Sequence, residues 1–228
     1  MTTAENYRYR NPLIQLRHPF TCLIAGASGS GKTHFLTNLL MYSDLLIDVP
    51  IQRLVYCYGA EIPATFKKLK SKFPFLEVYE GLNENLKFNS RINNFLIIDD
   101  LMTDSVKSNA ISDYFTKGSH HSNLSVILLT QNFFQQGAYA RTINTNANYV
   151  VYFKNPRDNL QIQYLGRQIY SGKSQILTES FKNATERPHG YIFLDFKQTT
   201  PDEYRLKTNI LPSDPGRPLV YIPKNKVI

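Results

Sequence analysis

Short apolar runs alternate with amphipathic segments along the chain. Runs rich in β-branched and aromatic residues predict strands, and apolar positions at helical spacing predict helices. The predicted strands cover residues 20–25, 52–58, 75–79, 95–98, 125–132, 149–153, 191–196 and 204–210. The predicted helices cover residues 34–40, 63–73, 106–117, 160–169 and 174–185. This alternation predicts an α/β fold with a mostly parallel central sheet and extra C-terminal strands.

The chain of 228 residues is predicted to fold as one domain over residues 19–210. A chain of this length can bury a core that needs no disulfide staples, and its hydrophobic fraction of 42% is ordinary for a globular protein. Residues 1–18 are interpreted as an N-terminal arm, which we expect to pack on its own domain rather than on another subunit or on DNA. Residues 211–228 contain four prolines, so they are interpreted as an extended C-terminal tail.

A glycine-rich turn follows the first predicted strand and opens the first predicted helix. Its residues are Gly26, Ala27, Ser28, Gly29, Ser30, Gly31, Lys32 and Thr33, followed by His34. Such glycines let backbone N–H groups curl around a phosphate, and the helix N-terminus adds its positive dipole end. Lys32 can reach the β- and γ-phosphates, and the Thr33 hydroxyl can ligate Mg²⁺. An ordinary glycine turn is the alternative, but the flanking strand and helix favour a P-loop. A P-loop predicts a three-layer P-loop NTPase fold. It also predicts that residues 26–34 bind a nucleoside triphosphate.

Two acidic residues, Asp99 and Asp100, come directly after the apolar run of residues 95–98. Four consecutive apolar residues predict a strand buried on both faces, as central parallel strands are. In P-loop enzymes an aspartate at the end of such a strand holds Mg²⁺, and the next acid polarises the attacking water. We assign Asp99 the first role and Asp100 the second. The alternative is a strand followed by an acidic turn or a helix cap.

Gln131 stands at the polar end of the next buried strand, residues 125–132. In open α/β sheets, groups at the carboxyl ends of strands face the ligand crevice. Gln131 is therefore predicted to sense the γ-phosphate or to orient water. A neutral strand-end amide without a catalytic role is the alternative.

The net charge of +8 makes an acidic partner plausible, with nucleic acid first, although simple solubility explains a charge of this size equally well. Cys22 and Cys57 lie in apolar strand-like runs and are interpreted as buried thiols rather than a disulfide or a metal site. The pair His120–His121 is interpreted as exposed loop residues rather than as metal ligands. The sequence shows no secretory leader and no apolar run long enough to cross a bilayer. We therefore expect a soluble, intracellular protein.

Four stretches of the sequence together resemble the FtsK/HerA-type P-loop ATPases. More narrowly, they resemble the poxvirus-type genome-packaging ATPases that are also found in virophages and virus-like transposons. The stretches are the P-loop, FLIIDD (95–100), KGSHHSNLSVILLTQN (117–132) and YVVYFKNPRD (149–158). The resemblance covers about residues 15–210.

This resemblance implies an Mg²⁺-dependent ATPase whose ring of identical subunits, a pentamer or hexamer, pumps double-stranded DNA. It implies a virus-encoded protein that packages DNA into a capsid, with capsid proteins as further partners, in the infected cell and at the virion vertex. It also implies a sheet in which the strand carrying the catalytic acids lies beside the P-loop strand. An arginine from one subunit would complete the neighbour's site. The candidates are Arg141, Arg157 and Arg167, each of which is otherwise a surface arginine; Arg141 ranks first because it is predicted to lie in a polar loop after Gln131.

Two other functions remain open at this point. A small-molecule kinase also uses a P-loop, but it usually carries several arginines in a lid, and no arginine occurs between Asp100 and Arg141. An AAA+-like loader or helicase in DNA replication would require a helical C-terminal lid, whereas the C-terminal part here is rich in predicted strands and prolines.

Overall fold

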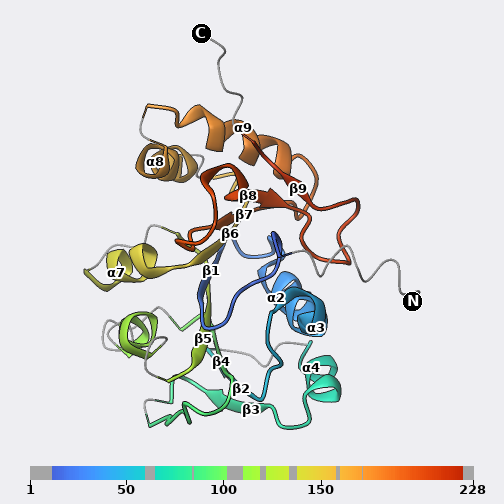
Figure 1. Cartoon of the computed structure of the whole chain (residues 1–228), viewed down its shortest axis with the longest axis vertical. Helices are drawn as coiled ribbons and strands as arrows, with labels where there is room; N and C mark the ends of the chain where they lie inside the picture. The colour runs from blue at the N-terminus through green and yellow to red at the C-terminus, as the bar shows by residue number, and fades with distance from the viewer. Residues whose placement is uncertain are drawn as a thin grey trace.

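A nine-stranded sheet forms the centre of the molecule (Figure 1). The computed structural model describes residues 12–59, 65–83, 85–101, 110–118, 122–133, 138–157, 160–170 and 172–222. The strand order is β3-β2-β4-β5-β1-β6-β7-β8-β9. The strands are β1 (Thr21–Ala25), β2 (Arg53–Tyr58), β3 (Glu77–Glu80), β4 (Asn94–Asp99), β5 (Leu124–Thr130), β6 (Tyr149–Phe153), β7 (Tyr191–Asp195), β8 (Leu206–Thr208) and β9 (Leu219–Val220). Strands β1 to β6 pair in parallel and β7 to β9 add antiparallel, which confirms the predicted mostly parallel sheet with extra C-terminal strands.

Helices cover both faces of the sheet and complete the predicted three layers (Figure 1). The helices on one face are α2 (Lys32–Met41), α3 (Ser43–Leu46) and α4 (Phe66–Lys72). Across the sheet are the π-helical turn η1 (Tyr114–Gly118) and the helices α7 (Ala138–Asn146), α8 (Leu160–Ile169) and α9 (Gln175–Ala184), and a 3₁₀ turn η2 (Asp202–Tyr204) precedes β8. None of the helices in the described ranges is long and apolar enough to span a membrane.

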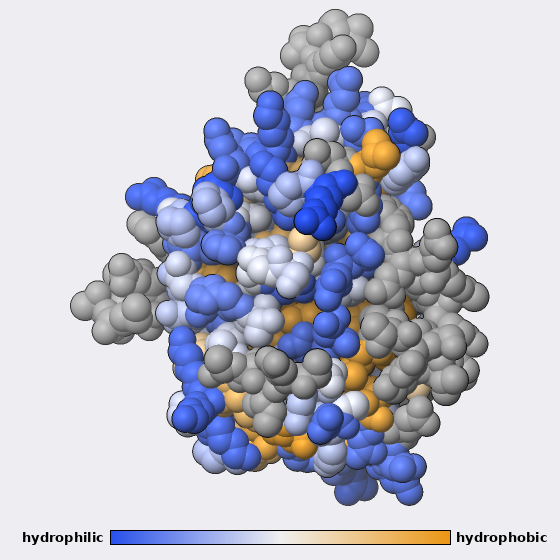
Figure 2. All heavy atoms as spheres, turned by 180° about the vertical axis from the view of Figure 1, so that it is seen from behind, coloured by the Kyte–Doolittle hydropathy of each residue, from blue (hydrophilic) through white to orange (hydrophobic). Residues whose placement is uncertain are grey.

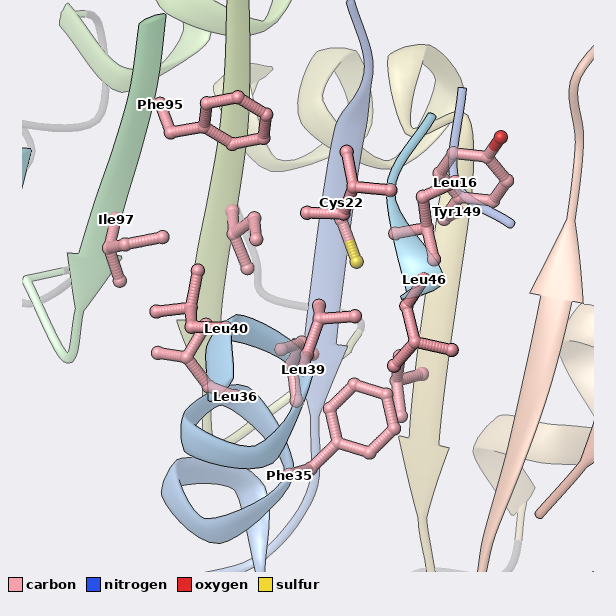
Figure 3. Close-up of a cluster of buried hydrophobic side chains, with 14 of the residues drawn as sticks. Leu16, Cys22, Phe35, Leu36, Leu39, Leu40, Leu46, Phe95, Ile97 and Tyr149 are labelled. Carbon is pink, nitrogen blue, oxygen red and sulfur yellow. The ribbon is translucent and has the colours of Figure 1, made fainter. Parts of the chain in front are cut away.

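Alternating side chains of the central strands supply two hydrophobic cores, one for each face. On β1, Cys22 and Ile24 belong to the core under α2, whereas Leu23 and Ala25 belong to the core on the opposite face. Figure 3 shows Phe35, Leu36, Leu39 and Leu40 of α2 directed at the sheet. Since both faces of β1 are buried, its sequence is an unbroken apolar run rather than an alternating one. Hydrophilic side chains dominate the upper part of the rear view, and apolar ones appear mainly lower down (Figure 2).

The order of the strands corrects one expectation. The acid-bearing strand β4 does not lie beside the P-loop strand β1, because β5 is inserted between them. Ala25 of β1 pairs in register with Thr130 of β5, and Leu129 of β5 pairs with Asp99 of β4. The carboxyl end of β5 therefore separates the P-loop from the two acids.

The polar segment before β6 corrects a second expectation, because Arg141 lies in helix α7 and not in a loop. The side chain of Ile143 is 1% exposed and that of Ala147 is 5% exposed, so the segment has a narrow apolar stripe. The amide of Asn144 donates a hydrogen bond to the carbonyl of Phe133 (2.9 Å). The burial of Ile143 and this hydrogen bond support a helix whose polar sequence had too weak a periodic pattern to predict it.

Both ends of the described chain pack on the domain. Leu16 is buried and forms a parallel bridge with Ile47, so residues 12–18 of the predicted arm lie against the sheet domain. Strand β9 lies within the segment predicted as a tail and pairs with β8. Residues 1–11 and 223–228, and the first part of the helix predicted over residues 106–117, lie outside the described residues.

Candidate active site

The glycines of the P-loop satisfy two different requirements. Gly29 and Gly31 have φ values of 74° and 110°, in the left-handed region that favours glycine. Gly26 is needed for space, since a Cβ there would lie 2.7 Å from the Cβ of Phe153 and 2.8 Å from the Oγ of Ser30. The loop therefore closes tightly between the end of β1 and the end of β6 before α2 begins.

Lys32, the first residue of α2, is folded back over this loop. Its ammonium donates hydrogen bonds to the carbonyl oxygens of Gly26 (2.7 Å) and Ala27 (3.0 Å). Burial lowers the pKa of Lys32, and the nearby Asp100 and Asp99 carboxylates oppose that shift. A phosphate oxygen can replace a loop carbonyl as the acceptor and offset the desolvation of the ammonium with a full negative charge.

A cleft of about 340 Å³ opens beside Lys32 at the carboxyl ends of the strands. Its lining residues come from the P-loop, from the start of α2, and from the ends of β4 and β5. They are Ser28, Gly29, Gly31, Lys32, Thr33, His34, Asp99, Asp100, Leu129, Thr130 and Gln131. The structure thus brings together the predicted P-loop residues, both acids and the strand-end glutamine.

Asp99 is held by Tyr56, which no sequence pattern singled out. The hydroxyl of Tyr56, on the neighbouring strand β2, donates a 2.6 Å hydrogen bond to Oδ2 of Asp99. Burial raises the pKa of Asp99, the Tyr56 bond opposes that shift, and the Asp100 charge adds to it. The signal for Tyr56 was a tyrosine in the middle of a buried strand, because a buried hydroxyl needs a hydrogen-bond partner.

Asp100 has a left-handed backbone with φ of 54°, which is unusual for a residue other than glycine. Its carbonyl approaches Gly59 so closely that a Cβ on that glycine would lie 2.7 Å from the oxygen. The amide of Gln131 donates to Oδ2 of Asp100 at 3.4 Å. The inserted strand β5 thus sets Gln131 against the second acid.

Two further residues contact the P-loop. Nδ1 of His189 lies 3.1 Å from the carbonyl oxygen of Ser30, and His189 has a left-handed backbone with φ of 59°. The Oγ of Ser30 is buried and has no hydrogen-bond partner among the described residues. His189 was not singled out from the sequence, where an isolated histidine in a loop gives no signal.

None of the three candidate arginines appears among the residues that line this cleft. Arg141 is exposed on α7, and Arg157 is exposed in the turn after β6, beyond the same ends of the strands as the P-loop. Arg167 is exposed on α8, where its guanidinium lies 5.8 Å from the centre of the Tyr164 ring.

The oxygen atoms in the cleft fit a small divalent cation. Thr33 supplies a hydroxyl and Asp99 a carboxylate, which are hard ligands that Mg²⁺ prefers. No group of three or more His, Cys, Asp or Glu side chains with metal-binding geometry occurs in the described part of the chain. In nucleotide sites, phosphates and waters usually complete the coordination of Mg²⁺. His120 and His121 lie outside the described residues.

The model of the Poxvirus A32 protein family matches residues 6–179, which is well over half of the chain and includes the P-loop, both acids and Gln131. The chain belongs to this family. It is a family of viral DNA-packaging ATPases, in agreement with the resemblance found in the sequence. No curated protein matches the chain. In this A32-family chain, strands β7, β8 and β9 all lie beyond the matched segment.

Proposed function

We propose that this chain is an ATP-hydrolysing motor that translocates double-stranded DNA into a viral capsid. The observation that carries the proposal is the convergence of Lys32, the Asp99–Asp100 pair and Gln131 on one cleft beside the P-loop. Membership in a family of DNA-packaging ATPases supplies the nucleic-acid context.

In the proposed reaction, the N–H groups of the P-loop and the Lys32 ammonium bind the β- and γ-phosphates. Thr33 and Asp99 hold Mg²⁺, which neutralises charge on the phosphates when bound. Asp100 polarises the attacking water, and Gln131 orients that water and senses the γ-phosphate. The contact between Gln131 and Asp100 supports a shared task at one water molecule.

The site needs a further positive charge for the phosphate that is transferred. Because the described cleft is lined by no arginine, we propose that a neighbouring copy of the chain supplies it, with Arg141 and Arg157 as candidates. Such a heterologous contact closes into a ring, which we expect to be a pentamer or hexamer. Its partners are double-stranded DNA and capsid proteins, in the infected cell and at the virion vertex.

The AAA+-like alternative required a helical lid at the C-terminus. The described residues after α9 instead form β7, β8 and β9 with one 3₁₀ turn, which supports the motor over the loader. The kinase alternative is addressed by experiment.

The test is an ATPase assay on size-selected protein, with and without double-stranded DNA. We expect Mg²⁺-dependent hydrolysis that DNA stimulates and that is lost in Lys32→Ala and Asp99→Ala. DNA binding should depend steeply on salt and little on sequence, since phosphate contacts dominate. Phosphoryl transfer to a nucleoside or nucleotide acceptor without any response to DNA would instead identify a kinase.

A further inference from the structure

A second cavity, of about 420 Å³, lies on the other side of the P-loop helix from the two acids. It shares Gly31 and His34 with the phosphate cleft, so the two cavities adjoin at the N-terminus of α2. We propose that this cavity is the nucleoside subsite, which holds the base and ribose of the triphosphate bound at the P-loop. The inference rests on the proposed function and adds where the nucleoside is recognised.

The inner walls of the cavity are apolar and aromatic. Phe35 of α2 and Tyr191 of β7 pack edge to face with ring centroids 4.8 Å apart, and Phe153 of β6 lies beside both. Pro188 and Leu211 add further apolar surface. Phe35, Phe153 and Tyr191 are each only 2% exposed, so they form a tightly packed apolar floor of the cavity, as is usual in small-molecule sites.

The outer wall is made of two loops that hydrogen bonds hold together. Arg187 donates to the carbonyl of Pro215 (2.9 Å) and, through a short bond, to the side chain of Asn209. These bonds join the loop before β7 to the loop after β8. His189, in the first of these loops, contacts the P-loop carbonyl of Ser30. These contacts hold the two loops in place, and a wall that is held in place lowers the entropic cost of binding.

Asp214 gives the cavity a specific polar group. Its Oδ2 accepts hydrogen bonds from the Tyr191 hydroxyl (2.5 Å) and from the backbone N–H of Leu211 (2.9 Å). Among the described residues both bonds use Oδ2, so Oδ1 can accept a bond from a ribose hydroxyl or an exocyclic base amine. A few convergent polar groups on apolar walls are typical of a small-molecule site.

The two loops lie in the sequence beyond residue 179, outside the segment that the A32 family model matches. The phosphate cleft is thus lined by family-matched residues, whereas the outer wall of the proposed nucleoside subsite is particular to the C-terminal part of this chain.

The test compares the equilibrium binding of ATP with that of inorganic tripolyphosphate by calorimetry. Ser213→Trp fills the cavity from an exposed position that makes no contact with the phosphate cleft. Ser71→Trp, at an exposed position of α4, is the matched control. We expect Ser213→Trp to weaken ATP binding about tenfold or more and to leave tripolyphosphate binding unchanged, because base contacts are lost and phosphate contacts kept. The control should bind both ligands as the unmodified chain does.

Equal ATP affinity in the Ser213→Trp and Ser71→Trp proteins would overturn the subsite while leaving the phosphate cleft intact. Failure of the proposed function has a different signature, because the unmodified chain would then bind ATP, and Ser213→Trp would still weaken that binding, but its ATPase rate would not respond to double-stranded DNA. Retained tripolyphosphate binding also shows that the Ser213→Trp protein is folded.

Discussion

At the scale of single residues, the site depends on the side chains that contact the two acids at the end of β4. Asp99 and Asp100 are adjacent in sequence but sit in different environments. Asp99 is partly buried and is bonded to Tyr56, whereas Asp100 is exposed, left-handed and beside Gln131. The first environment suits a fixed metal ligand, and the second suits a group that must exchange bonds with water.

Tyr56→Phe tests this support, since it removes one hydroxyl and keeps the buried ring. Without that donor the pKa of Asp99 rises further and the carboxylate loses its fixed orientation. We expect the Mg²⁺ concentration for half-maximal ATPase activity to rise about tenfold, the equivalent of one hydrogen bond to a charged group. This concentration is measured by following the ATPase rate as Mg²⁺ is titrated.

Tyr79→Phe is the matched control. It removes a comparable tyrosine–carboxylate bond, from Tyr79 to Glu77 (3.2 Å), at a place outside the cleft. An identical Mg²⁺ requirement in the Tyr56→Phe and Tyr79→Phe proteins would limit Tyr56 to a structural role.

At the scale of elements, the edge strand β3 is tied to β2 by an ion pair as well as by its backbone. Arg53 donates to both carboxylate oxygens of Glu77, at 2.7 Å and 3.0 Å, and also to the carbonyl of Lys87 (2.6 Å). The hydrogen bonds and charge of Arg53 lower the pKa of Glu77 despite the opposing effect of burial. This bidentate pair fixes the register of a short, half-exposed strand.

The pair predicts a pH-dependent contribution to stability. Because the pKa of Glu77 is lower in the folded protein than its ordinary value of 4.5, the folded state binds fewer protons than the unfolded state does at pH values near and below 4.5. The stabilisation by the ion pair is therefore complete above pH 4.5. It is lost as the pH falls through the lowered pKa that Glu77 has in the folded protein. Glu77→Gln should reduce the free energy of unfolding at pH 7 by less than about 1 kcal/mol, because the pair is partly exposed.

Urea unfolding at about pH 7 and about pH 3.5 measures this effect. The difference between Glu77→Gln and the unmodified chain should shrink at the lower pH. Glu80→Gln makes the same charge change at an exposed position of the same strand and should show no such trend. A difference for Glu77→Gln that is equal at both pH values would contradict an ionic origin.

At the scale of the whole molecule, the proposed motor needs more than one copy of the chain. The cleft gathers the P-loop, both acids and Gln131, but the candidate arginines are exposed elsewhere on the surface. If an arginine acts on the neighbour's phosphate, an isolated subunit binds ATP and turns it over slowly.

Mixing two inactive variants tests action between subunits. Lys32→Ala removes the phosphate ligand, and Arg141→Ala or Arg157→Ala removes the candidate arginine while leaving ATP binding intact. Each variant should be strongly impaired alone, since such an arginine contributes about 10³-fold or more to turnover. An equal mixture should regain about a quarter of the ATPase activity of the unmodified ring. Random assembly places an intact cleft next to an intact arginine at about a quarter of the subunit interfaces.

Arg167→Ala provides the comparison for this mixing experiment. The guanidinium of this third candidate lies over the ring of Tyr164 on its own helix α8, so we expect the Arg167→Ala protein to hydrolyse ATP normally. Normal hydrolysis by either the Arg141→Ala or the Arg157→Ala protein alone would remove that residue from the assignment. Absence of recovery in both mixtures would count against action between subunits.

Several features could be predicted from the sequence because their causes are local. The turn at residues 26–33 carries glycines that its backbone and close packing require, and the confirmed strand at residues 95–98 is apolar because both of its faces are buried. Cys22 and Cys57 are buried free thiols, as predicted. The segment that the A32 family model matches contains this turn and this strand.

Other features were decided by tertiary structure, because they join segments far apart in the chain. The insertion of β5 between β1 and β4 follows from the path of the connections, and it alone sets Gln131 beside Asp100. The hydrogen bond from Tyr56 to Asp99 joins two strands. Helix α7 forms where the buried Ile143 packs into the hydrophobic core on its face of the sheet. Local sequence determined the phosphate-binding turn, since backbone conformation is a short-range property. The arrangement around it depended on packing, which short-range patterns do not encode.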